Sequence, residues 1–282
     1  MHPMLTRATR AFTLIELLMV VAIIGILVSL TAGGLAQAKA RAHRITCLNN
    51  QRELHTVWHK FADDNDDRLV VNSNPLNSIN PVTTNIPWAS GGVHQFYATV
   101  TNEMFLTDPQ YSAFAYARLN PRLYRCGAIK HNINGRPMIR HYSMNPYLGL
   151  QGASSFGAPG GFETYRRMND VTQPSERAVF IEMNPYIICT TAVRLNNLQA
   201  DTTAGSPTAG QIIGGDFATL PIFPHGKSSI VSFADGHVDQ RKRQTDEMER
   251  VWPVDWLADH WNLHASDNAD FLWFANHFTR GR

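Results

Sequence analysis

The longest apolar run of the chain lies near its N-terminus. No residue between Leu17 and Ala38 is charged, and most positions from 17 to 30 carry aliphatic side chains. About 20 such residues in a helix span the ~30 Å hydrocarbon core of a lipid bilayer. The pattern therefore predicts a transmembrane helix over residues 12–34.

The pattern changes after this run, but the helical periodicity continues. Over residues 35–62, apolar side chains recur at helical spacing with polar residues between them, and no proline interrupts them. Such a stripe is typical of a helix that packs one face on a globular partner. We therefore predict one helix over residues 12–62, about 75 Å long, whose second part is amphipathic. The acidic run at 63–67 ends it, because carboxylates oppose the dipole at a helix C-terminus.

Farther along the chain, shorter apolar runs predict strands. Residues 228–234 form one such run, which leads into Asp235 and Gly236. An Asp-Gly pair supplies the positive φ angles of a two-residue hairpin turn, so the next four residues are expected to return as the partner strand. The predicted fold class is α+β: a long N-terminal helix packed on an antiparallel β-sheet head that comprises residues 63–282.

The C-terminal segment, residues 251–282, is rich in aromatic residues. It contains Trp252, Trp256, Trp261, Trp273, Phe271, Phe274 and Phe278. One interpretation is a helix packed on the head. The other is an exposed aromatic face that binds a neighbouring subunit, since aromatic residues concentrate where interfaces bind most strongly.

Composition narrows the class of protein. Charged residues make up 17% of the chain and hydrophobic residues 44%, which excludes a disordered chain. The net charge of +2 lacks the basic character of a nucleic-acid-binding domain, so no nucleic-acid partner is predicted. The sequence contains no nucleophile elbow, phosphate-binding glycine loop or paired-cysteine zinc motif. We therefore expect no enzyme activity, no cofactor and no bound metal.

Two histidines, His55 and His59, lie four residues apart and share one face of the predicted helix. Such a pair can bind zinc, but the zinc-protease motif has glutamate directly after the first histidine, and Thr56 stands there. A surface or interface pair is the preferred interpretation.

Charged residues around the apolar run indicate its orientation. Arg7 and Arg10 precede it, and by the positive-inside rule they keep the N-terminus in the cytoplasm. We therefore predict a single-pass protein of the inner membrane with an extracytoplasmic head. Glu16 is the one acid within the run, where a carboxylate costs a few kcal/mol. It either reaches the interface from the helix end or pairs with a cation inside the membrane.

Residues 11–21 resemble the cleavage and methylation site of type IV prepilins and type II secretion pseudopilins. The resemblance implies that residues 1–11 are a leader peptide and that a prepilin peptidase cuts between Ala11 and Phe12. It further implies that the same enzyme N-methylates Phe12, and that Glu16 pairs with the N-terminal amine of a neighbouring subunit during assembly. Alanine stands where glycine is more common before the cut.

A second resemblance covers much of the remaining chain. His225 and the pair Asp235-Gly236 are separated by nine residues, as in the prepilin-type processing-associated family named after its H-X9-DG motif. Further segments resemble that family in the same order: residues 47–54, 124–126, 142–149 and 171–176. Two interpretations of the motif are open. Asp235-Gly236 can fix a turn while His225 caps a loop, or a metal site can form from His225, His237 or Asp239.

The same resemblance implies a disulfide between Cys47 and Cys126, because both cysteines fall in family motifs and Cys189 does not. Disulfides persist outside the cytoplasm, where the head is predicted to lie. Such a bond would close a long loop and stabilise the fold by a few kcal/mol.

Together these resemblances imply a structural subunit of a type II secretion pseudopilus or a type IV pilus-like filament. Its partners would be the prepilin peptidase, the inner membrane and other pilin or pseudopilin subunits. The alternative is a membrane-anchored extracytoplasmic module that binds a ligand or a metal and uses the prepilin route for export. In either case residues 225–240 form a hairpin in the head.

Overall fold

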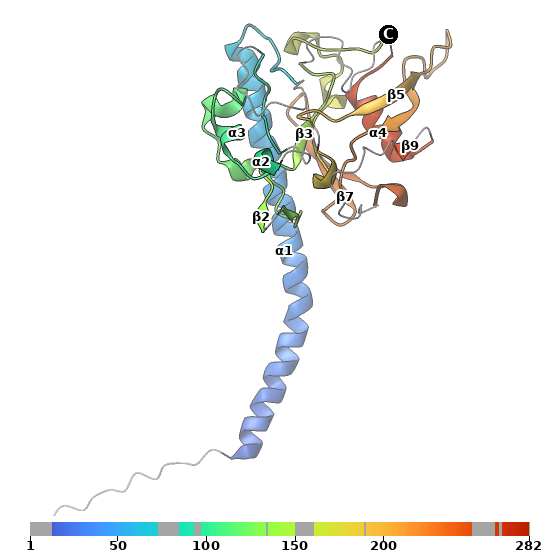
Figure 1. Cartoon of the computed structure of the whole chain (residues 1–282). Helices are drawn as coiled ribbons and strands as arrows, with labels where there is room; N and C mark the ends of the chain where they lie inside the picture. Colours follow the sequence, from blue (N-terminus) through green and yellow to red (C-terminus); the bar gives the residue numbers. More distant parts are fainter. Residues whose placement is uncertain are drawn as a thin grey trace, which may run out of the picture. The chain divides into compact units, whose positions relative to one another are not determined.

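One continuous helix opens the described part of the chain. In the computed structural model, α1 runs from Leu14 to Asp64 (Figure 1), close to the predicted 12–62. The structure describes residues 13–72, 85–92, 97–133, 135–149, 161–188, 190–249, 263–264 and 267–281. The chain divides into two units, residues 1–42 and 43–282. The second part of α1 therefore belongs to the same unit as the sheets.

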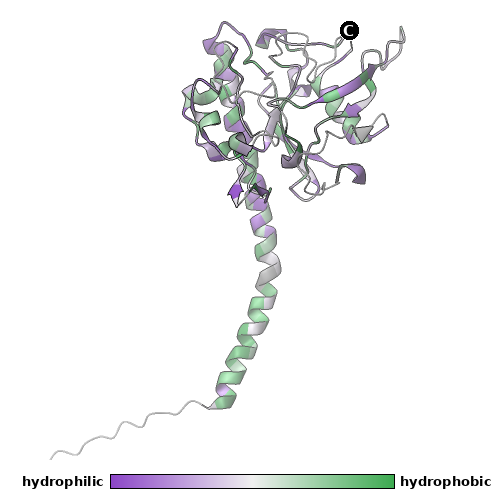
Figure 2. Cartoon of the chain, in the orientation of Figure 1, coloured by the Kyte–Doolittle hydropathy of each residue, from purple (hydrophilic) through white to green (hydrophobic). Residues whose placement is uncertain are grey.

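The first unit is a helix with apolar side chains on every face. Its large apolar side chains from Leu14 to Leu30 are exposed, 80% for Leu14 and 63% for Leu18. In Figure 2 this stretch is coloured almost throughout as hydrophobic. A helix that is apolar all round needs an apolar environment. By length and composition, α1 is able to cross a membrane.

At its other end, α1 stops inside the acidic run 63–67. Asp66 and Asp67 adopt left-handed backbone conformations, with φ of 55° and 66°. The N–H of Asp67 donates to the carbonyl of Ala62 at 2.9 Å, which satisfies one of the last carbonyl groups of the helix. The Asp67 carboxylate also accepts the N–H of Asn169 at 3.1 Å. The run thus closes the helix and fixes the loop beside it.

The second unit contains three antiparallel sheets among its described residues. The largest has the strand order β3-β4-β7-β8, the second β5-β6-β9, and the third pairs β1 with β2. The strands are β1 Asn132–Ile133, β2 Arg136–Pro137, β3 Tyr142–Met144, β4 Ala178–Glu182, β5 Leu195–Ala200, β6 Ile212–Phe217, β7 Ser228–Phe233, β8 Val238–Lys242 and β9 Leu263–His264. Together with α1 these sheets confirm the predicted α+β class.

Short helices connect the strands, and a longer one lies near the C-terminus. The α-helices are α2 Tyr97–Val100, α3 Met104–Thr107 and α4 Ala269–Phe278. The described residues also form 3-10 turns at Ala113–Ala117, Pro121–Tyr124, Met168–Asp170, Pro174–Glu176, Pro185–Ile187 and Asp246–Glu249.

Both faces of the central sheet β3-β4-β7-β8 are covered. On one face, Trp58 of α1 shares a buried core with Ile230 of β7. On the other face, Phe271 of α4 shares a second core with Val231. Successive side chains of a strand point to opposite faces, so neighbouring residues of β7 serve the two cores. This explains why every residue of β7 is buried.

β7 and β8 form an antiparallel hairpin in the segment for which the sequence predicts one. The turn differs in length from the prediction. The N–H of Phe233 donates to the carbonyl of His237, so three residues, 234–236, form the loop rather than two. Gly236 occupies the left-handed position, with φ of 97°. A three-residue loop of this kind needs positive φ at one position only, and glycine supplies it.

The aromatic C-terminal segment is in part a packed helix. Phe271, Phe274 and Phe278 of α4 are fully buried against the second face of the central sheet. Trp273 is half-buried, and the guanidinium of Arg241 lies 4.7 Å from its ring centre. Over residues 269–278 the structure thus agrees with the packed-helix interpretation. Trp252, Trp256 and Trp261 lie outside the described residues.

Candidate functional site

The first turn of α1 contains a capping box around Glu16. Thr13 precedes the helix, and its N–H and hydroxyl donate to Glu16 Oε2 at 2.9 and 2.8 Å. In return the N–H of Glu16 donates to the Thr13 hydroxyl at 3.3 Å. The exchange satisfies two donors that a helix start leaves unpaired. Sequence analysis missed this role, although the Thr-X-X-Glu spacing of residues 13–16 signals it.

The predicted processing residues, Ala11 and Phe12, lie outside the described residues. The structure places Glu16, four positions beyond Phe12, at the start of the helix. Behind it follows the apolar stretch whose side chains nothing in the described chain covers.

The structure does not bring the two ends of the H-X9-DG segment together. His225 precedes β7, and its N–H donates to the carbonyl of Ser228 at 3.0 Å. Asp235 follows β7, and its carboxylate lies 2.6 Å from Nδ1 of His237. The six residues of β7 separate the two ends by about 20 Å. Asp235 and Gly236 therefore belong to the turn, and His225 cannot share a metal ion with His237.

His225 instead joins a buried cluster with Cys47, Cys126 and Glu182. Its Nε2 lies 3.0 Å from Glu182 Oε1 and 3.3 Å from Cys126 Sγ. The sulfur atoms of Cys47 and Cys126 lie 2.9 Å apart. The four donor atoms all lie within 4.8 Å of one another. Within the described ranges, no other group of three or more histidine, cysteine or acidic side chains is close enough to share an ion.

The cysteine pair in this cluster is the one for which the family resemblance implies a disulfide. The structure places the two sulfurs in contact, as thiols, in the core of the head. Cys189 lies outside the described residues. The bond itself stays a prediction.

Amide side chains of α1 hold the helix against the segments that carry the cluster. Asn50 Nδ2 donates at 3.0 Å to the carbonyl of Arg125, directly before the second cysteine. Gln51 Nε2 donates at 2.8 Å to the carbonyl of Ile230 on β7. Cys47 lies one turn before these residues, so the same contacts bring its sulfur to the sheet.

Glu182 is the last residue of β4 and is fully buried. Its Oε2 accepts the N–H of Ile230 at 2.8 Å, which turns Oε1 toward His225. Sequence analysis did not single out this residue. Its signal is a single acid at the end of an otherwise apolar strand, because a buried carboxylate is costly unless it has partners.

Burial and mutual contact shift the protonation of the cluster. Burial raises the pKa of Glu182, and the hydrogen bond with His225 opposes it. Burial lowers the pKa of His225, but its contacts with Cys47 and Glu182 outweigh burial and raise this pKa to about 9. Contact with the Cys126 sulfur lowers the pKa of Cys47 to about 4, whereas burial raises the pKa of Cys126. The cluster therefore favours a negative Cys47 beside a positive His225.

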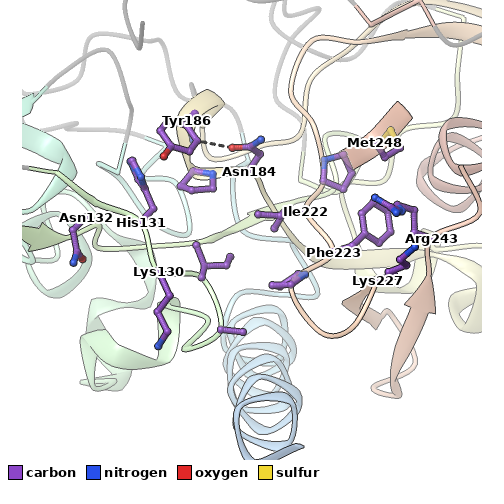
Figure 3. A pocket seen from close by; sticks show the side chains of 15 residues that line it. Lys130, His131, Asn132, Asn184, Tyr186, Ile222, Phe223, Lys227, Arg243 and Met248 are labelled. Carbon is purple, nitrogen blue, oxygen red and sulfur yellow. Dashed lines mark hydrogen bonds between the residues drawn. The ribbon is translucent and has the colours of Figure 1, made fainter. Parts of the chain in front are cut away.

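A cavity of about 670 Å³ lies in the same unit. Figure 3 shows Lys130 and His131 on one side of it and Lys227 and Arg243 on the other. Aromatic and apolar side chains complete the wall, and none of the described residues that line it is acidic. Arg243 pairs with Asp246 at 2.9 Å, so Lys130 and Lys227 provide most of the uncompensated charge. The cavity suits a small anionic ligand.

His55 is buried, which corrects the predicted surface or interface pair. It is 5% exposed and its ring centre lies 5.3 Å from that of Trp58. His59 is exposed and lies 3.3 Å from the carboxylate of Asp63. Burial lowers the pKa of His55 to about 4. Although the two histidines are four residues apart, His55 faces the core and His59 faces solvent.

Comparison with known proteins identifies the N-terminal segment. Residues 6–32 match the family model of the prokaryotic N-terminal methylation motif. The match includes Ala11, Phe12, Glu16 and the apolar run, and it supports a prepilin-like protein that a prepilin peptidase processes. The motif and the apolar helix together fit anchoring in a membrane. No curated protein and no solved structure matches the chain.

Proposed function

We propose that the chain is a pilin- or pseudopilin-like structural subunit rather than an enzyme. A prepilin peptidase removes residues 1–11 and methylates Phe12, and the mature subunit enters a type II secretion pseudopilus or a type IV pilus-like filament. One observation carries this proposal. The methylation motif at 6–32 coincides with a helix whose apolar side chains are exposed on every face.

The exposed apolar stretch supports assembly because it needs a new partner when it leaves the membrane. Lipid covers residues 14–30 in the bilayer, and only the same segment of neighbouring subunits can cover them in a filament. Glu16 then requires a cation, since an unpaired carboxylate in an apolar core costs several kcal/mol. The methylated amine of Phe12 supplies that cation. Both bonds from Thr13 end on Oε2, which leaves Glu16 Oε1 for the amine.

Substitution of Glu16 tests this proposal, because the residue has two separable roles. Glu16→Gln keeps a side chain that can complete the capping box but removes the charge. Thr13→Ala removes the cap and keeps the charge. We expect normal membrane insertion of both variants, loss of filament incorporation in Glu16→Gln, and retention in Thr13→Ala. Normal incorporation of Glu16→Gln would contradict the charge pairing.

Intact-mass measurement tests processing and separates the two kinds of filament. Membranes and material sheared from the cell surface are analysed separately from the native cell. Loss of residues 1–11 with one added methyl group in the sheared fraction indicates a surface pilus. The same mature mass confined to membranes indicates a short pseudopilus or an anchored head. An uncut chain in both fractions contradicts the proposal.

The cavity favours a second candidate function, a membrane-anchored module that binds a small anionic ligand outside the cytoplasm. Its support is the pair of lysines, Lys130 and Lys227, on opposite sides of a cavity with apolar walls. The probes are glucuronate, with glucose as the matched neutral sugar, and inorganic phosphate. Binding to the full chain is measured by calorimetry, with Lys227→Gln as the variant. Equal or absent binding of all three probes contradicts this candidate.

A further inference from the structure

The buried cluster of Cys47, Cys126, Glu182 and His225 has the donor set of a metal site. It offers two thiols, one imidazole nitrogen and one carboxylate oxygen from four segments far apart in the sequence. Zinc binds these ligand types, and four of them complete the tetrahedral shell of a structural zinc site. We propose that these four side chains bind one zinc ion, and that the ion ties α1 to the central sheet.

The donors converge without help from an ion. Nε2 of His225 faces both Cys126 Sγ and Glu182 Oε1, at 3.3 and 3.0 Å. The N–H of Ile230 holds Glu182 Oε2 at 2.8 Å, so Oε1 is the oxygen that coordinates. Hydrogen bonds of this kind, outside the ligand shell, commonly orient the ligands of zinc sites.

The distance between the sulfurs is compatible with two occupants. Two thiolates on a tetrahedral zinc ion, each about 2.3 Å from the metal, stand roughly 3.8 Å apart. A disulfide brings them to about 2.05 Å. The observed 2.9 Å between Cys47 Sγ and Cys126 Sγ lies midway. Small movements of the two sulfurs lead either to the zinc site or to the disulfide. The groups around the sulfurs therefore determine which of the two is favoured.

These neighbours favour the metal. A disulfide is uncharged and uses only the two cysteines, whereas the side chains of Glu182 and His225 are 0% and 1% exposed beside the sulfurs. Glu182 and His225 pair with each other, but the desolvation cost of a buried ion pair can exceed the attraction between its two charges. Zinc uses all four groups at once. On binding, Cys126 releases its thiol proton and His225 releases the proton on Nε2, while the imidazole keeps its proton on Nδ1.

This proposal does not depend on the proposed function. All four ligands lie in the unit of residues 43–282, whereas Glu16 and the methylation motif lie in the unit of residues 1–42. Failure of filament assembly therefore leaves the metal site untouched, and the reverse also holds.

The first test measures what the native chain contains. The full chain is extracted from membranes in detergent and metal-free buffer without reductant. Zinc per chain is measured by plasma mass spectrometry, and thiols are alkylated after unfolding in chelator. We expect one zinc per chain and alkylation of both Cys47 and Cys126. A disulfide between Cys47 and Cys126 without zinc overturns the proposal.

The second test assigns the ligands. The reduced full chain is stripped with chelator and loaded with Co²⁺, which reports thiolate ligands by charge-transfer absorption in the near ultraviolet. We expect this absorption in the unaltered chain, a roughly twofold loss in Cys126→Ser, and no change in the control Cys189→Ser. His225→Asn should lower zinc affinity at least tenfold. A folded, reduced, unaltered chain without the thiolate absorption overturns the proposal, whatever the variants do.

Discussion

The two parts of α1 lie in opposite surroundings, although one helix contains both. Residues 14–30 are apolar on every face, and their large side chains are exposed. Residues 43–64 are amphipathic, and Leu54 and Trp58 among them are fully buried in the head. The apolar side chains of the first part are not covered by the rest of the chain. The main apolar side chains of the second part are buried against the head. The distribution of apolar residues around a helix, more than their number, therefore indicates its environment.

A leucine-to-alanine substitution should affect the stability of the head very differently in the two parts of α1, and this is the largest difference that we predict. Leu54→Ala removes a side chain from the core between α1 and the central sheet, and such losses cost about 2–5 kcal/mol of folding free energy. Leu18→Ala removes a side chain that is 63% exposed, so the unfolding of the head should not change. Denaturant unfolding of the full chain in detergent, followed by tryptophan fluorescence, measures both. Equal effects would show that the first part also packs on the head.

Lowering the pH should destabilise the head through His55, the buried histidine of the pair on α1. The pKa of His55 falls from 6.5 to about 4 on folding. Burial and the repulsion of His59 outweigh the hydrogen bond with the Ala234 backbone and the attraction of Asp235. Between pH 6.5 and about 4 the unfolded chain therefore binds a proton that the folded chain does not. Stability contributed by neutral His55 is fully present above pH 6.5 and falls as the pH is lowered, by at most about 3 kcal/mol.

The matched variants for this prediction are His55→Gln and His59→Gln. Neither glutamine titrates, so His55→Gln should lose less stability between pH 7 and 4 than the unaltered chain. His59→Gln is the matched exposed control, because the side chain of His59 lies in solvent. Identical pH profiles for the unaltered chain and His55→Gln would contradict the burial argument.

Removal of a helix cap should destabilise the head when the cap lies in the head, but not when it lies at the start of α1. The expected difference is smaller than for the leucine substitutions. Asn268 caps α4, and its Oδ1 accepts the N–H groups of Asp270 and Phe271 at 3.0 Å each. Asn268→Ala should cost about 1–2 kcal/mol of head stability. Thr13→Ala removes the corresponding cap of α1 in the other unit, where it should leave the unfolding of the head unchanged. Urea unfolding of the two variants measures the difference.

Local patterns predicted the parts of this structure that local physics dictates. Three local patterns predict the bounds of α1 to within two residues at each end: the apolar run, the amphipathic stripe that follows it, and the acidic run at 63–67. The Asp-Gly pair locates the hairpin, because glycine is needed where φ is positive. The missed capping box was equally local. The Thr-X-X-Glu spacing of residues 13–16 predicts it, although the same glutamate also places a charge in the membrane segment.

The buried cluster could not be predicted in the same way. Its four residues are separated by between 43 and 99 positions where they contact, so no spacing rule joins them. The cysteine pair was singled out from family resemblance alone. Glu182 and the surroundings of His225 depend on how β4 and β7 pair, since that register brings the end of one strand to the start of the other. Sequence periodicity predicts which face a residue occupies, but not which distant residue meets it there.

Substitutions of two glycines by alanine should have the smallest effects on stability. The two positions differ in the backbone conformation that they require. Gly236 has a φ of 97° at the β7–β8 turn, and an added Cβ would lie 3.6 Å from His55, an ordinary contact. Gly236→Ala should therefore cost about 1 kcal/mol through backbone strain alone. Gly33 lies within α1, where an added Cβ meets nothing within 4 Å, so Gly33→Ala favours the helix and leaves head unfolding unchanged. If thermal unfolding shows no loss in Gly236→Ala, the turn tolerates a different conformation, and the positive φ is not what fixes the hairpin.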